Sequence, residues 1–337
     1  MKTCAFLLTA LALALASLAA PAEEAKKEPP KKKFNRPGRP GVKKPGVQRP
    51  LASITPDAVF PVEGVPDWQV VTEDAVWISN KPKGTIHRLD VKTNKPIAAI
   101  KVGEKPCSGL AAGFGSIWVP NCGDMTVSRV DIKENKVVAT VPVGPAHTEG
   151  GITASPDSVW ICSDPKGTLS RIDPATNQVV AEISVAPGSF AAAYGDGAVW
   201  VTSTEKNLLQ RVDPATNLVT HEIEVGPEPR FLTVGDGAVW TLNQGDGTIS
   251  RVDAKTNKLV STIDAGIPGA GGEIAFGEGY VWVTVFQIPL TQIDPNKNQV
   301  VKQWTGPGGD AVRVGHGSVW LTNIREQNVW RINPNQP

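Results

Sequence analysis

Seven tryptophans recur in the hydrophobic pattern of this chain at nearly equal intervals of 38 to 42 residues. Each of them lies in a short apolar run, such as residues 198–201, which read Ala-Val-Trp-Val. They are Trp77, Trp118, Trp160, Trp200, Trp240, Trp282 and Trp320. A fixed period of this length indicates that one structural unit is repeated along the chain.

Each unit contains four short apolar runs separated by turn signals. A tight turn such as Gly195-Asp196-Gly197 comes before the tryptophan run, and a third run follows about ten residues later, as at residues 168–173. The sequence Asp-Pro-Ala-Thr-Asn at 173–177 then favours a second turn, because Pro presets φ and Asn tolerates a left-handed backbone. The fourth run follows at 179–185. We therefore expect four antiparallel strands per unit.

A four-stranded meander cannot bury both of its faces alone, so the units must stack on one another. Seven such units predict an all-β fold, a seven-bladed β-propeller with four-stranded antiparallel blades. The last unit ends after its third strand, at 328–333, whereas residues 57–64 resemble a fourth strand such as 137–144. We expect the N-terminal strand to complete the last blade and close the ring, which makes residues 51–337 one domain.

The first fifty residues differ from the rest in composition. Residues 1–22 combine Lys2, an apolar run and a small-residue exit at Ala20-Pro21-Ala22, the pattern of a secretory signal peptide. Residues 23–50 are rich in Pro and carry ten basic and three acidic side chains, a net charge of +7. We expect this segment to be a disordered linker, which is either a solvated tether or an attachment to an anionic envelope surface or to another protein's acidic face.

The remaining residues, 51–337, carry 23 basic and 30 acidic side chains, a net charge of −7. This sign argues against binding of nucleic acid by the propeller, since phosphate neutralisation needs a basic face. The signal pattern predicts a secreted or periplasmic protein, and we expect a monomer.

The repeated Asp-Pro-x-Thr-Asn-x-Val-Val string, with the Gly-x-Gly-x-Val-Trp turn, resembles the YVTN-type repeat propellers and the virginiamycin B lyase-like group. This resemblance covers all seven units. It implies the propeller fold and a metal-assisted ring-opening elimination that uses His and Glu near the channel mouth. In this chain no Glu stands three residues after any of the seven tryptophans.

Residues that vary between units identify the candidate site. Positions nine to eleven before each tryptophan begin the innermost strand, which lines the axial channel. They hold Asp67, Trp68, Cys107, Ser108, Glu149, Ser189, Phe190, Arg230, Glu273 and Asp310. The predicted ligand-binding set is Asp67, Trp68, Ser108, Phe190, Arg230 and Asp310. Four of these inner-strand positions hold carboxylates, and three interpretations of this cluster are open. It is a solvated rim of the channel, a site for a ligand or cation, or a set of groups for acid-base chemistry.

The predicted catalytic residues are His147, Glu149 and Glu273. His147 is chosen because it lies two residues before Glu149 in a longer loop. Glu149 and Glu273 are also the candidate metal ligands, and hard carboxylate oxygens suit Mg²⁺ or Ca²⁺. The alternative is that no cofactor is bound.

Cys107 and Cys122 lie symmetrically about the turn at residues 113–116, so they face each other across a hairpin. In an oxidising compartment this arrangement predicts a disulfide, and Cys162 is then free or competes for Cys122. A second recurring feature is an Arg two residues before an Asp, as in Arg171 and Asp173, which predicts a belt of ion pairs between blades.

Two functions follow from these observations. The first is an exported binding or scaffold protein that recognises a ligand or a protein partner at the channel face. The alternative is a divalent-cation-dependent lyase or lactone hydrolase that uses Glu149, Glu273 and His147.

Overall fold

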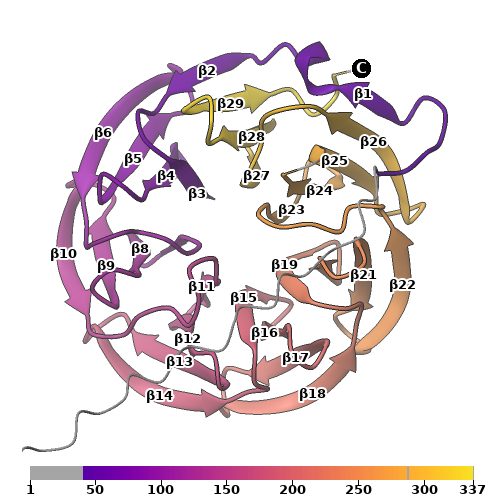
Figure 1. The fold of residues 1–337 in the computed structure, drawn as a ribbon. Helices are drawn as coiled ribbons and strands as arrows, with labels where there is room; N and C mark the ends of the chain where they lie inside the picture. The colour runs from indigo at the N-terminus through magenta and orange to yellow at the C-terminus, as the bar shows by residue number, and fades with distance from the viewer. Residues whose placement is uncertain (1–40, 287, 337) are drawn as a thin grey trace, which may run out of the picture. The chain divides into compact units, whose positions relative to one another are not determined.

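The computed structural model describes residues 41–286 and 288–336, and these residues form seven sheets arranged as the blades of a ring (Figure 1). The predicted all-β, seven-bladed β-propeller is therefore confirmed. The predicted signal peptide at 1–22 and residues 23–40 of the predicted linker lie outside the described residues. Within the described ranges, no helix has the length and apolar character needed to cross a membrane.

In each of the first five blades, four strands follow one another in chain order from the axis outward, as Figure 1 shows. Blade one holds β3 (Pro66–Val71), β4 (Ala75–Asn80), β5 (Thr85–Asp90) and β6 (Lys95–Lys101). Blade two holds β7 (Ala111–Gly113), β8 (Ser116–Asn121), β9 (Thr126–Asp131) and β10 (Lys136–Val141). Blade three holds β11 (Ile152–Ala154), β12 (Val159–Asp164), β13 (Thr168–Asp173) and β14 (Gln178–Ser184). Blade four holds β15 (Ser189–Gly195), β16 (Ala198–Ser203), β17 (Leu208–Asp213) and β18 (Leu218–Glu224). Blade five holds β19 (Pro229–Gly235), β20 (Ala238–Asn243), β21 (Thr248–Asp253) and β22 (Lys258–Asp264).

The last two blades include the N-terminal strands. Blade six holds β23 (Ile274–Gly277), β24 (Tyr280–Val285), β25 (Ile288–Asp294), β26 (Gln299–Thr305) and, on its outer edge, β1 (Gln48–Pro50). A short 3-10 helix, η1 (Leu51–Ser53), leads from β1 toward blade seven. Blade seven holds β27 (Val312–Gly315), β28 (Ser318–Asn323), β29 (Asn328–Ile332) and β2 (Ala58–Pro61). Because β2 pairs with β29 in antiparallel register, the N-terminal strand completes the last blade as predicted (Figure 1).

Residues 41–50 belong to the segment predicted to be a solvated linker, yet they lie on the propeller. Strand β1 pairs in parallel with β26, and Val47 is 5% exposed. The backbone N–H of Gly41 donates to the carbonyl of Gly266, 2.9 Å away. This ordered edge corrects the predicted linker boundary, because backbone pairing and one buried valine fix residues whose polar composition gives no strand pattern.

The seven repeated tryptophans form the layer that joins neighbouring blades. All of them are at most 1% exposed. Each indole also satisfies its polar N–H locally, as where Trp200 Nε1 donates to the carbonyl of Gly195 at 3.1 Å. Burial of one such side chain stabilises the fold by at least 1.5–3 kcal/mol, on the order given for large apolar side chains.

The predicted turns have the backbone that their residues require. In the turn between the first two strands of blade four, Asp196 and Gly197 have φ of 49° and 73°. Two successive positive φ values are typical of the type I′ hairpin, which suits the twist of antiparallel strands. In the outer turns the Asn occupies the left-handed position, as Asn177 does with φ of 58°.

Five of the six recurring Arg side chains link neighbouring blades through backbone carbonyls, and the predicted ion pairs with the recurring Asp are absent among the described residues. Arg171 stacks over Trp160, with Cζ 4.9 Å from the ring centroid. Its Nη1 reaches the next blade and donates to the carbonyl of Pro214 and to Asn217 Oδ1, at 2.8 and 2.9 Å. Asp173 instead accepts the backbone N–H of Ala175, and this hydrogen bond lowers the pKa of its carboxyl. The Asp therefore caps a turn, and the Arg bridges blades through neutral oxygens.

Candidate functional site

The predicted site residues gather at the end of the channel where the inner strands begin. Asp67 and Trp68 belong to β3, Phe190 belongs to β15, and Arg230 belongs to β19. The others lie in the loops that enter the inner strands, namely Ser108, His147, Glu149, Glu273 and Asp310. We call this end of the channel the mouth.

A buried acid pair with one lysine occupies the mouth beside blade one. Asp67 and Asp310 are 5% and 7% exposed, and Lys81 Nζ lies 2.7 Å from Asp67 Oδ2. Burial raises the pKa of Asp310 well above its usual range, and the neighbouring Asp67 raises it further. Burial also raises the pKa of Asp67, against the pull of Lys81. The pair therefore retains a proton at pH values where exposed carboxyls have lost theirs.

Lys81 is a site residue that the sequence analysis missed. It follows Asn80 at the end of β4, in the turn that leads to β5. Burial acts to lower the pKa of Lys81, but Asp67 outweighs this effect and the pKa is raised. Its cationic form therefore persists in the mouth and balances the charge of the acid pair.

A second group of predicted residues lines a recess beside this pair. Its volume is about 360 Å³, and its walls include Cys122, Met125, Pro145, Ala146, His147, Thr148, Phe190 and Arg230. His147 stacks on Phe190 with ring centroids 4.8 Å apart. Arg230 lies over the same phenyl ring, with Cζ 4.6 Å from the centroid. Residues from three separate blades thus form one recess with flat faces and a guanidinium.

The charge of Arg230 is balanced within the site. Its Nη2 lies 2.5 Å from Glu149 Oε2, and its Nη1 donates to Gln244 Oε1 at 3.2 Å. Burial lowers the pKa of His147, and Arg230 adds to this effect, so the imidazole is neutral at pH 7. Within the described ranges, His147 Nε2 is buried without a hydrogen-bond partner. The recess therefore combines a neutral imidazole with a pre-paired guanidinium.

Two of the predicted ligand-binding residues, Trp68 and Ser108, are buried and contact the backbone of the mouth loops. Trp68 is 4% exposed, contacts Phe231 in a tilted arrangement with ring centroids 5.5 Å apart, and donates its indole N–H to the carbonyl of Cys107. Ser108 is 1% exposed, and its hydroxyl donates to the carbonyl of His147 at 2.9 Å. Both side chains fix the loops of the mouth and lie outside the walls of the recess.

Glu273 is held by an arginine that the sequence analysis did not select. Arg313 of β27 forms an ion pair with it through Nη1, and the backbone N–H of Val312 donates to Glu273 Oε2 at 3.1 Å. Burial raises the pKa of Glu273 to about 7 in spite of Arg313. A comparison of the blades could have found Arg313. It stands seven residues before Trp320, where the other blades have Val, Ala or Thr.

The predicted metal ligands do not fit a divalent cation in this arrangement. Glu149 and Glu273 each contact a guanidinium, through Arg230 and Arg313 respectively. Among the described residues, no three His, Cys, Asp or Glu side chains are grouped so that they could hold a metal ion. No catalytic step through a metal is therefore derived from this site.

The cysteines stabilise the same end of the channel. Cys107 and Cys122 form a disulfide with their Cα atoms 5.9 Å apart, the pairing expected from their symmetric positions about the hairpin. Cys162 is free and buried, and burial raises the pKa of its thiol to about 12. The disulfide anchors the loop that carries Ser108, next to the recess.

Several solved protein structures are similar to this propeller. A streptogramin B lyase superposes with a TM-score of 0.70 at 20% identity, over 82% of this chain and 96% of that chain. Virginiamycin B lyase from Staphylococcus aureus gives 0.69 at 16% identity, over 82% and 98%. These likenesses show that this chain shares its fold with the two proteins. Hydrazine synthase from Kuenenia stuttgartiensis also matches this propeller, with 0.69 at 16% identity over 84% and 98%. No family model and no curated protein matches the propeller sequence.

Proposed function

We propose that this propeller is an exported binding protein that recognises a small organic molecule in the recess at the channel mouth. The observation that carries the proposal is the convergence of His147, Phe190 and Arg230 from three blades on one recess of about 360 Å³. This volume lies within the range of small-molecule sites, which combine flat apolar walls with a few polar groups.

The chemistry of the recess favours recognition of a flat molecule with a polar edge. The ring faces of His147 and Phe190 offer stacking contacts. Arg230 adds a guanidinium that Glu149 and Gln244 already hold in place, and His147 adds a neutral imidazole ring. Because the charges are paired before a ligand arrives, binding requires little reorganisation of the site.

The experiment is a screen of small aromatic compounds by ligand-observed NMR, with every hit measured again by calorimetry. We expect Arg230→Gln and Phe190→Leu to weaken the hits at least tenfold, because each removes one wall of the recess. Arg325→Gln, an exposed arginine in the turn after β28, is the matched control and should leave affinity unchanged. Hits that bind both recess variants as tightly as the wild type would contradict the proposal, as would lactone turnover that Arg230→Gln leaves intact.

The export part of the proposal rests on residues 1–22 and has its own test. Expressed in a bacterial host with its own leader, the protein should appear in the periplasm with a new N-terminus at Glu23. Full-length protein retained in the cytoplasm would count against export.

We also propose that the basic segment attaches the propeller to an anionic envelope surface. Residues 23–40 carry seven basic and three acidic side chains. Each basic side chain near an anionic surface contributes about 1 kcal/mol at most, and salt screens the attraction. Vesicles with anionic lipid should therefore sediment residues 23–337 at low salt and release them at high salt. Residues 41–337, which lack most of the charge, are the control, and equal sedimentation of both would refute the attachment.

A further inference from the structure

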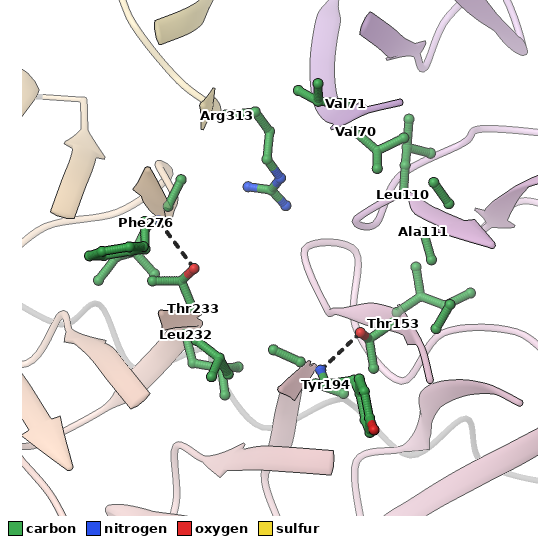
Figure 2. Close-up of a pocket in the computed structure, with 18 of the residues that line it drawn as sticks. Val70, Val71, Leu110, Ala111, Thr153, Tyr194, Leu232, Thr233, Phe276 and Arg313 are labelled. Carbon is green, nitrogen blue, oxygen red and sulfur yellow. Dashed lines mark hydrogen bonds between the residues drawn. The ribbon is translucent and has the colours of Figure 1, made fainter. Parts of the chain in front are cut away.

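The axial channel contains a second cavity that shares no lining residue with the recess. Its volume is about 350 Å³, and it lies between the inner strands of the blades, where Figure 2 shows it. Most of the residues that line it have aliphatic side chains, including Val71, Leu110 and Leu232, and polar atoms account for most of its exposed surface. The size is at the lower end of the range for small-molecule sites.

One ring of residues around this cavity breaks the repetition of the blades. The ring consists of the residues that pair across the sheet with each repeated tryptophan: Val70, Ala111, Thr153, Ala193, Thr233, Ala275 and Arg313. Six of these are small or β-branched, and the seventh is an arginine. Six blades have no arginine at this register, so the repeated scaffold does not require one, and in blade seven Arg313 pairs with the buried Glu273 through Nη1 only.

Arg313 presents part of its guanidinium to the cavity. Figure 2 shows the side chain extending from β27 into the space between the inner strands. Its side chain is 26% exposed. In the part of the chain that the structure describes, both of its polar contacts use Nη1, to Glu273 and to the carbonyl of Val312. The edge formed by Nη2 and Nε therefore remains for a ligand, and this edge matches a carboxylate with two parallel hydrogen bonds.

Two hydroxyls in the same ring add to this polarity. Thr153 Oγ1 accepts the backbone N–H of Tyr194 at 3.0 Å, and Thr233 Oγ1 accepts that of Phe276 at 3.2 Å (Figure 2). A hydroxyl that accepts one hydrogen bond keeps its own proton for donation. The cavity thus offers one guanidinium edge and two hydroxyl donors within an aliphatic wall.

We propose that the axial cavity binds a small organic monocarboxylate, with the carboxylate on Arg313 and the apolar body against the aliphatic ring. An anion is favoured over a neutral molecule because the remaining guanidinium edge carries positive charge and two parallel N–H donors, which pair with the two oxygens of a carboxylate. The aliphatic walls contribute affinity in proportion to the apolar area that the ligand buries.

The test is calorimetric titration of the full chain with benzoate, and with benzamide as the neutral analogue of the same shape. We expect benzoate to bind and benzamide to bind at least tenfold more weakly. Arg313→Gln should reduce benzoate affinity at least tenfold, whereas Arg325→Gln should not change it. Arg313→Lys should give an intermediate loss, because a lysine keeps the charge and loses the planar fork.

A second variant keeps the proposal testable if substitution of Arg313 disturbs folding. Ala193→Leu fills the cavity from another blade and leaves Arg313 and Glu273 in place. It should abolish benzoate binding while the thermal transition remains. Absence of benzoate binding to the wild type, or equal binding by Ala193→Leu, would overturn the proposal. Arg230→Gln should not affect benzoate, so failure at the recess and failure in the cavity are distinguishable.

Discussion

The side chain of Glu273 is 4% exposed and lies against Arg313, yet its pKa is raised to about 7. Burial outweighs the nearby positive charge because a carboxylate loses much hydration when water is excluded. The protonated form is therefore favoured in the folded state relative to the unfolded chain, in which the carboxyl has a pKa of 4.5. The contribution of Glu273 to the unfolding free energy is therefore fully present below about pH 4.5, and it is lost as the pH rises to about 7.

The direction of this pKa shift leads to the first prediction. The unfolding free energy of the wild type should fall between pH 4.5 and 7 by an amount that includes a contribution on the order of 3 kcal/mol from Glu273. Glu273→Gln should remove that contribution and flatten the profile. Urea denaturation across this pH range measures the unfolding free energy of both proteins. Because Asp67 and Asp310 are present in both, the difference between the two profiles reports Glu273. Parallel profiles for the two proteins would show that Glu273 does not titrate in this window.

A second prediction concerns the thiols. Iodoacetamide reacts with thiolate, and Cys162 is buried with a pKa of about 12. For protein without residues 1–22, and therefore without Cys4, we expect no alkylation of the native state and one modified cysteine, Cys162, after denaturation without reductant. Peptide mapping should find Cys107 joined to Cys122. Labelling of native Cys162 at the rate of a free peptide cysteine would contradict its buried position.

At the scale of elements, the closing strand β2 provides a matched pair of side chains. Phe60 is 2% exposed and contacts Trp320, with ring centroids 5.7 Å apart. Val59, the preceding residue on the same strand, is 50% exposed. Phe60→Ala should lower the unfolding free energy by about 3–5 kcal/mol, and Val59→Ala by less than about 0.5 kcal/mol.

Chemical denaturation of the two variants measures this difference. It tests the closure of the ring, because Phe60 contributes only if β2 is docked on β29. Equal stabilities for Phe60→Ala and Val59→Ala would indicate that β2 is not docked in solution.

The elements of the fold could be predicted because each blade repeats the same signals. The position of Trp200 and the strand that contains it recur in every unit, and the turn at Asp196 recurs in most of them, so errors at one blade are corrected by the others. Strand β1 could not be predicted, since three residues of a Pro-rich basic segment carry no alternating pattern. It pairs with β26 through its backbone, which sequence patterns do not report.

The site could be predicted only in part, because its residues depart from the repeat. Phe190 and Arg230 were found from their register, and they do line the recess. Register could not show that Trp68 points into the packed interior or that Glu149 pairs with Arg230, since both depend on contacts between blades. Arg313 also departs from the repeat, but it lies three residues beyond Asp310, further along the inner strand than the predicted site positions.

At the scale of the whole molecule, closure predicts a single cooperative unfolding transition. No blade can separate without exposing two tryptophan layers, because each packs against two neighbours. Trp200→Ala should lower the stability of the entire ring by about 3–5 kcal/mol, and tryptophan fluorescence and circular dichroism should still give coincident transitions.

Leu218→Ala, on the outer strand of the same blade, is the control for this variant. Leu218 is 62% exposed, so its truncation should change stability by less than about 0.5 kcal/mol. Two separated transitions in Trp200→Ala would show that blades unfold independently and that the ring is not closed as described.

The lone arginine among seven related positions also affects how a guest could sit in the tunnel. A guest on the axis of seven like sectors would meet similar walls at every rotation and could adopt many poses of similar energy. Arg313 removes that degeneracy, because a guest with one charged end gains its strongest contact in one rotational setting only. A single side chain thus selects one orientation of the guest inside a scaffold that is otherwise close to rotationally symmetric.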